Sequence, residues 1–136
     1  MNIILCLDDR NGMLFAGRRQ SRDRKVTEDI GRMVEEAEAK LWISPFSARL
    51  FEESSFQPEI DEAFMEKVEP EDYCLVENLP LAAYEEEITS LIVYRWNRHY
   101  PADFRLDLDL NEWRLQSRSD FVGFSHECIT KEEYIR

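Results

Sequence analysis

A short segment near the start of the chain gathers cationic side chains in an otherwise acidic protein. Residues 10–25 hold six cations against one acid, Asp23, whereas the whole chain has a formal charge of −12. The segment therefore carries +5 and the remainder carries −17. Arginine is suited to planar, bidentate contact with phosphate or carboxylate, so the segment could hold an anion. The cations are Arg10, Arg18, Arg19, Arg22, Arg24 and Lys25.

The position of this basic segment supports an anion site. It runs into the expected start of a helix, where free backbone N–H groups and the helix dipole favour negative charge, and Ser21 adds a hydroxyl. A nucleotide, a phosphorylated metabolite or an acidic peptide could be the ligand. A second interpretation is equally open, because the basic patch could neutralise the protein's own acidic surface or form a homodimer contact.

Two adjacent acids follow the first expected strand. Asp8 and Asp9 lie at its carboxyl end, where ligands enter open α/β sheets, and an Asp pair there can bind metal or act as a general base. Such residues also form ordinary turns, here before Gly12. We favour the turn and keep Asp9 as a candidate ligand-binding residue.

The two histidines indicate no familiar metal or catalytic site. His99 and His126 have no neighbouring histidine and no Cys-x-x-Cys pair, so zinc spacing is absent and no metal site is predicted. Ser125, His126 and Glu127 adjoin in sequence, which is not how a nucleophile triad is built, because successive strand residues face opposite ways. We expect structural roles for both histidines.

Composition fixes the broad class. A chain of 136 residues with 43% apolar and 34% charged residues predicts one globular domain spanning 1–136. Basic and aromatic residues alternate over 94–100, and such side chains could stack on nucleic-acid bases. The net charge of −12, however, opposes binding to a phosphate backbone, so no nucleic-acid partner is expected. Three scattered cysteines, no signal peptide and no apolar span predict a cytoplasmic protein without a membrane partner.

Apolar periodicity predicts an α/β sheet with helices between its early strands. Helical pieces are expected from Ser21 to Ala37, with Ser21 or Asp23 as the cap, and near 45–51, 60–68 and 81–88. The predicted fold is a single-domain, three-layer-type sheet with parallel core strands and an antiparallel C-terminal hairpin. Strands are expected at 2–7, 41–43, 73–76, 91–96, 104–110 and 124–130.

In chain order, these segments resemble a shortened dihydrofolate-reductase-like fold. Leu91 to Arg95 resembles that family's long strand ending in a Thr-Arg pair, residues 100–104 resemble its following loop, and 109–113 resemble the turn before its last strands. The opening strand with Asp9 and Gly12 is similar to the family's first strand and loop. The resemblance implies that Asp23 takes the place of the acid that pairs with the family's pteridine ring.

Departures from that family bear on its cofactor. The Gly-Gly turn after the cofactor strand would fall near Glu77 and Asn78, where no glycine stands and an acid would repel a pyrophosphate. The family's Gly-Arg-x-Thr helix start corresponds to residues 44–47, which lack both Gly and Arg. We also expect the chain to be short by about one strand and its crossover. These departures predict a retained scaffold without a working NADPH site.

Three blocks are similar to a small bacterial family whose members are sometimes labelled ribonuclease Z. That label requires a His-x-His-x-Asp-His metal cluster, which two isolated histidines cannot supply. We therefore reject the nuclease interpretation. The blocks are residues 8–13, 18–23 and 94–98.

The leading hypothesis is a protein that binds a small anionic or heterocyclic ligand, nucleotide- or pterin-like. Arg18, Arg19, Ser21 and Arg22 would hold the anion, and Asp23 would accept a hydrogen bond from a ligand N–H. An interaction or homodimerisation module that uses the same basic loop is the alternative, and an active NADPH-dependent reductase is a third hypothesis. The sequence identifies no cofactor and no reaction.

Overall fold

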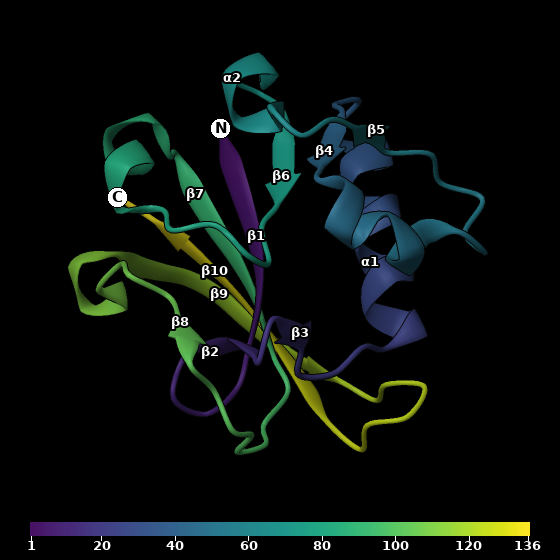
Figure 1. Cartoon of the computed structure of the whole chain (residues 1–136), viewed down its shortest axis with the longest axis vertical. Coiled ribbons are helices and arrows are strands. Elements are labelled where there is room, and N and C mark those ends of the chain that lie inside the picture. Colours follow the sequence, from purple (N-terminus) through teal and green to yellow (C-terminus); the bar gives the residue numbers. More distant parts are fainter.

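The computed structural model describes residues 1–136, built around a seven-stranded sheet in the order β5-β4-β6-β1-β7-β10-β9 (Figure 1). A separate three-stranded sheet has the order β3-β2-β8. The strands are β1 Asn2–Leu7, β2 Gly12–Phe15, β3 Arg18–Arg19, β4 Leu41–Ile43, β5 Glu59–Ile60, β6 Tyr73–Leu75, β7 Ser90–Arg95, β8 Phe104–Arg105, β9 Arg114–Phe121 and β10 Ile129–Ile135.

Five helical elements connect these strands. The only long one is α1, Arg24–Glu36, whose N-cap is Asp23, in agreement with the expected cap. The others are the short α2, Phe64–Lys67, and the 3₁₀ helices η1 Pro45–Phe51, η2 Ala82–Glu87 and η3 Leu110–Glu112. No helix in the structure combines the length and the apolar character needed to span a bilayer.

Strand β1 is central, as its unbroken apolar run predicts. It pairs in parallel with β6 on one side and with β7 on the other. Beyond β7 the direction changes, because β10 is antiparallel to both β7 and β9. The predicted fold class, parallel core strands with an antiparallel C-terminal hairpin, is confirmed.

The sheet separates two apolar cores, which gives the predicted layers. On one face Ile4 packs with Val26, Ile30 and Val34 of α1. On the other face Ile3, Leu5 and Leu7 pack with α2, with the residues flanking η2, and with the β2 strand. Alternate residues of β1 therefore supply both cores, as the pleat requires.

Two strand predictions near the C-terminus are wrong in extent. The alternating stretch 104–110 pairs as a strand only at Phe104–Arg105. The reason is that the carboxylate of Asp107 binds the segment before η2, accepting hydrogen bonds from the backbone N–H groups of Leu81 (2.8 Å) and Ala82 (3.0 Å). The leucines of this stretch still pack on the apolar core, although their backbone forms no strand pairing. The last strand begins at Ile129 instead of near 124, and the residues before it form a loop that turns toward α1.

The basic segment forms a hairpin that the sequence did not predict. Strands β2 and β3 pair antiparallel across a tight turn, where Ala16 and Gly17 both have positive φ, 51° and 72°. The turn places Arg18 and Arg19 on a short edge strand, and the chain then crosses to the start of α1. The hairpin therefore separates the cations of the basic segment onto different elements.

The two-core architecture predicts a large difference between two leucine truncations. Leu5 is fully buried and Leu115 on β9 is 46% exposed. Leu5→Ala should lower the free energy of unfolding by about 3 kcal/mol, because it leaves a cavity in the central strand, and Leu115→Ala should lower it by less than about 1 kcal/mol. Urea unfolding measures both. Similar losses for the two variants would contradict this assignment of the core.

Candidate functional site

Asp23 holds the start of α1 to the β9–β10 loop. Its side chain is buried and accepts five hydrogen bonds, all from its own chain. Oδ1 accepts from the backbone N–H groups of Lys25 (2.8 Å) and Phe124 (2.8 Å). Oδ2 accepts from the backbone N–H (2.9 Å) and hydroxyl (3.3 Å) of Ser125 and is 2.8 Å from Nδ1 of His126. Both oxygens are therefore fully used.

These contacts keep Asp23 ionised. Burial alone would raise the pKa of the carboxyl, but hydrogen bonds donated by Phe124, His126 and Ser125 outweigh it and hold the pKa well below the ordinary value of 3.8. The packing leaves no space beside the carboxylate, because a Cβ on Gly123 would lie 2.6 Å from Oδ2. The expectation that Asp23 accepts a hydrogen bond from a ligand is corrected here, since the protein supplies all of its donors.

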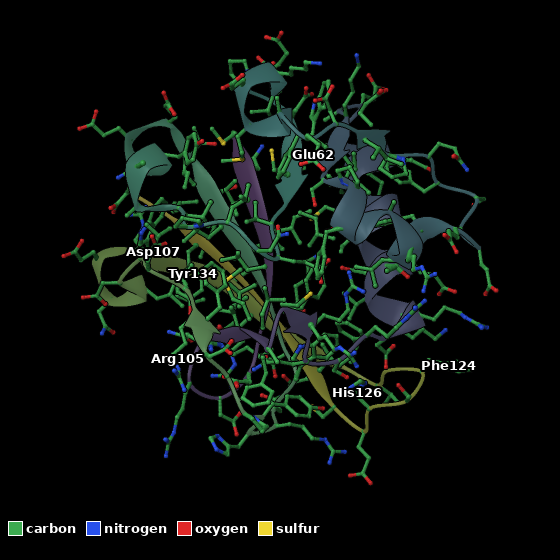
Figure 2. All side chains as sticks on the ribbon, viewed as in Figure 1. Glu62, Arg105, Asp107, Phe124, His126 and Tyr134 are labelled. Carbon is green, nitrogen blue, oxygen red and sulfur yellow. The ribbon has the colours of Figure 1, made fainter.

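His126 connects Asp23 to Ser21. Its ring is buried and stacks on Trp96, with 4.8 Å between ring centroids and 26° between ring planes. Nδ1 faces the Asp23 carboxylate, and Nε2 lies 2.9 Å from the hydroxyl oxygen of Ser21. Figure 2 shows His126 and Phe124 on the loop below the N-terminal end of α1. Ser21, His126 and Asp23 thus form a hydrogen-bonded row that joins residues about a hundred positions apart in sequence.

A groove of about 850 Å³ runs along α1 beside this row. Arg22 and Arg24 lie at its end near the helix start, and the Arg24 guanidinium is 4.5 Å from the centroid of the Phe124 ring. Phe124 is 64% exposed, so an aromatic face is open to solvent there. The lining residues are Arg22, Asp23, Arg24, Thr27, Glu28, Gly31, Arg32, Glu35, Leu50, Glu53, Ser54, Ser55, Phe56, Phe124 and Ser125.

Arg19 is bound by an acid of its own chain. Its Nε and Nη2 donate to the two carboxylate oxygens of Glu77, at 2.8 Å and 2.7 Å, and Nη2 also donates to the carbonyl of Phe46. Ser47 donates its hydroxyl to the same carboxylate at 2.7 Å. The pair is largely buried, with side chains 18% and 10% exposed. Arg19 is therefore not free to hold an anion, in contrast to the expectation for the basic segment.

Arg18 lies apart from these residues. It is exposed and lines a second hollow of about 530 Å³ with Gln20, Tyr100 and the turn of the β2–β3 hairpin. The basic segment thus presents Arg18 to one hollow and Arg22 to the groove, while Ser21 between them points to His126. A single cradle made of Arg18, Arg19, Ser21 and Arg22 is not what the structure forms.

Asp8 and Asp9 have different roles. Asp8 is buried, and its Oδ1 accepts from the backbone N–H groups of Arg10 (2.8 Å) and Gly12 (2.7 Å), so the favoured turn is confirmed. Burial would raise the pKa of Asp8, but these hydrogen bonds and one from Gln20 lower it. Asp9 is exposed and shows only a backbone hydrogen bond, from its N–H to the carbonyl of Arg98 at 2.9 Å.

The comparisons with known proteins agree with this architecture. No family model matches the chain, and no curated protein matches it in sequence. Among solved structures, it is similar to dihydrofolate reductase from Enterococcus faecalis, solved as a complex with NADP(H) and RAB-propyl, with a TM-score of 0.62 at 12% identity. The chain has the dihydrofolate reductase fold. At this identity the similarity shows the fold alone.

The match covers 99% of this chain and 95% of the reductase chain. The expected shortening by about one strand and its crossover stays a prediction. The resemblance to the small bacterial family stays a prediction. The row from Ser21 through His126 to Asp23 leaves no local pattern in the sequence, because its members come from the two ends of the chain.

The lowered pKa of Asp23 predicts an acid-dependent stability. Its native-state pKa lies below the unfolded value, so ionised Asp23 stabilises the fold above about pH 4, and this stabilisation is lost as the pH falls further. Asp23→Asn should reduce the free energy of unfolding by about 2 kcal/mol at pH 7 and show a smaller further loss between about pH 4 and pH 2. Urea unfolding across this pH range measures both effects.

Asp9→Asn is the matched control, because Asp9 is exposed, and it should keep the wild-type pH profile. Asp8 and Asp29 also have lowered pKa values, so the diagnostic quantity is the difference between wild type and Asp23→Asn. Parallel pH profiles for these two proteins would contradict the role given to Asp23.

The buried pair of Arg19 and Glu77 predicts asymmetric effects of single and double substitution. Glu77→Ala should lower the free energy of unfolding by about 3 kcal/mol, because it leaves the guanidinium of Arg19 without its carboxylate. Arg19→Leu combined with Glu77→Leu should recover most of that loss, since neither charge is then buried. Glu28→Ala, which breaks only the exposed contact to Lys25, should change stability by less than about 0.5 kcal/mol. Additive losses in the double variant would contradict the pairing.

Proposed function

We propose that this protein binds a small aromatic or heterocyclic anion, nucleotide- or pterin-like, in the groove along α1. The observation that carries the proposal is the arrangement at one end of the groove, where Arg24 lies over the exposed ring of Phe124 and Arg22 lines the same space. Neither guanidinium is in a salt bridge, unlike those of Arg19, Arg32 and Arg95. Arg22 is therefore the member of the predicted anion set that we retain, and Arg24 joins it.

The anion would lie at the two arginines. Free guanidinium groups offer paired N–H donors that match phosphate or carboxylate oxygens. Ser54 and Ser55 also line the groove and add two hydroxyls. The backbone N–H groups that begin α1 are not part of the proposal, because Asp23 caps them and brings its own negative charge.

The ring of the ligand would lie against the aromatic and apolar wall. Phe124, Phe56 and Leu50 line the groove, and a flat heterocycle can stack on such faces. Three carboxylates also line the groove, those of Glu28, Glu35 and Glu53, and in this proposal they would accept hydrogen bonds from ring N–H groups. Accepting a hydrogen bond from a ligand N–H is the role that the sequence-based hypothesis gave to Asp23.

NADPH is not the ligand in this proposal. The turn after β6, where the resemblance puts a Gly-Gly turn, carries Glu77 with both oxygens bonded to Arg19 and Ser47. A pyrophosphate at this turn would meet a buried carboxylate, and the nearest guanidinium is already paired. These residues do not fit the cofactor, so we propose a binding protein on a reductase scaffold and derive no hydride transfer.

Two further parts of the sequence-based hypothesis remain proposals. The cysteines Cys6, Cys74 and Cys128 are unpaired, which agrees with a cytoplasmic location. The alternative of a homodimer through the basic loop is tested by size-exclusion chromatography at low and high salt, because a dimer held by charge should dissociate as salt screens it.

Isothermal titration with guanosine monophosphate, pterin-6-carboxylate and NADPH tests the binding function. We expect one of the first two compounds to bind and NADPH not to bind. Arg22→Ala combined with Arg24→Ala should weaken that binding at least about tenfold, because charge-assisted hydrogen bonds to the anion are lost. Arg105→Ala combined with Arg118→Ala is the matched control, since it removes two exposed arginines that lie outside the groove.

The control should bind with wild-type affinity. Binding of neither anion by the wild-type protein, or equal weakening in the two double variants, would contradict the proposal. Tight binding of NADPH would instead support the reductase hypothesis.

A further inference from the structure

The row formed by Ser21, His126 and Asp23 has the connectivity of a hydrolytic serine site. The hydroxyl of Ser21 is 2.9 Å from Nε2 of His126, and Nδ1 of the same ring is 2.8 Å from Oδ2 of Asp23. Each distance is a normal hydrogen bond, and the two ring nitrogens contact different partners. A nucleophile, a base and an acid that orients the base are thus joined in order.

The surroundings of Asp23 fix the direction of every hydrogen in the row. The carboxylate is ionised and can only accept, so Nδ1 of His126 must carry the hydrogen that it donates. In the neutral ring, Nε2 then has a free lone pair and accepts the hydroxyl hydrogen of Ser21. This is the tautomer that a general base needs. Stacking on Trp96 holds the ring in that plane.

Ser21 is the most exposed residue of the row. Ser21 is half-buried, whereas Asp23 and His126 are buried behind it. The residue before it, Gln20, lines the hollow of about 530 Å³, and the residue after it, Arg22, lines the groove of about 850 Å³. Ser21 thus lies in the chain between a residue of one hollow and a residue of the other, although it lines neither hollow itself.

Donors for the developing charge are also available. The backbone N–H groups of Ser21 and Arg22 donate to no acceptor within the chain. In acyl transfer, the charge that forms on the carbonyl oxygen is stabilised by such free backbone donors next to the nucleophile.

From this geometry we infer that the protein hydrolyses small carboxylic esters that bear an anionic group, with Ser21 as nucleophile, His126 as general base and Asp23 as the positioning acid. The anionic group would lie at Arg22 and Arg24, so the substrate class follows from the proposed binding function, and this part of the inference rests on it. The serine row itself does not depend on the groove.

The reaction balances with water as the only co-reactant. The Ser21 oxygen forms a bond to the carbonyl carbon while Nε2 of His126 takes the hydroxyl proton. The ester C–O bond then breaks, and the same proton passes to the leaving alkoxide, which departs as an alcohol. Water attacks the acyl-serine, His126 takes a proton from it, and the carboxylic acid leaves as the proton returns to Ser21.

Covalent labelling tests the nucleophile directly. A fluorophosphonate probe forms a phosphorus–oxygen bond with an activated serine as fluoride leaves, and the labelled peptide is identified by mass spectrometry. We expect the label on Ser21 in the wild-type protein, no label in Ser21→Ala and at least about tenfold slower labelling in His126→Gln. Ser119→Ala and His99→Gln are the matched controls, because both residues are exposed and lie outside the row, and both should label at the wild-type rate.

Turnover of two nitrophenyl esters separates this inference from the proposed binding function. Ser21→Ala should lower kcat/KM for neutral p-nitrophenyl acetate at least about 100-fold. Arg22→Ala combined with Arg24→Ala should lower the ratio of kcat/KM for mono-p-nitrophenyl succinate to that for the acetate about tenfold. An unchanged ratio together with Ser21 labelling would refute the anion groove and leave the serine site standing.

Circular dichroism confirms that each variant is folded before it is assayed. Folded wild-type protein that carries no label on Ser21, or a Ser21→Ala variant that hydrolyses both esters as fast as wild type, would overturn the inference.

Discussion

The buried carboxylate of Asp23 is the contact on which the candidate site depends. One ionised group caps α1, binds two backbone N–H groups of the β9–β10 loop and orients His126. A charge in the interior is tolerated only when hydrogen bonds replace its water, and here five donors do so. The start of the helix, the loop and the histidine are therefore held together by one charge.

The basic segment illustrates how a charge pattern is distributed by folding. Its arginines are close in sequence, yet a hairpin and the start of a helix place Arg19 against Glu77, Arg18 at one hollow and Arg22 at another. Arg19 thus neutralises an acid of the same chain, as one interpretation of the sequence expected, whereas Arg18 and Arg22 form no salt bridge. Neither interpretation alone describes the segment.

The pair of Arg19 and Glu77 occupies the turn after β6. The architecture matches a reductase over nearly the whole of both chains. At the turn after β6, however, a carboxylate and a guanidinium satisfy each other, with Ser47 and the carbonyl of Phe46 completing their hydrogen bonds. Such an internal pair stabilises the turn and opposes entry of a second anion, because a buried charge that already has its partner gains little from another.

Local features of the sequence are enough to predict the α/β class, the central first strand, α1 with its Asp23 cap and the Asp8 turn, because each rests on local periodicity or local hydrogen bonding. It failed where a distant partner decides the outcome. The 104–110 stretch alternates like a strand, but Asp107 binds the chain before η2 instead. The hydrogen bonds of His126 to Ser21 and Asp23, and the ion pair of Arg19 with Glu77, were visible only in the tertiary structure. Side chains far apart in sequence leave no pattern until the backbone brings them together.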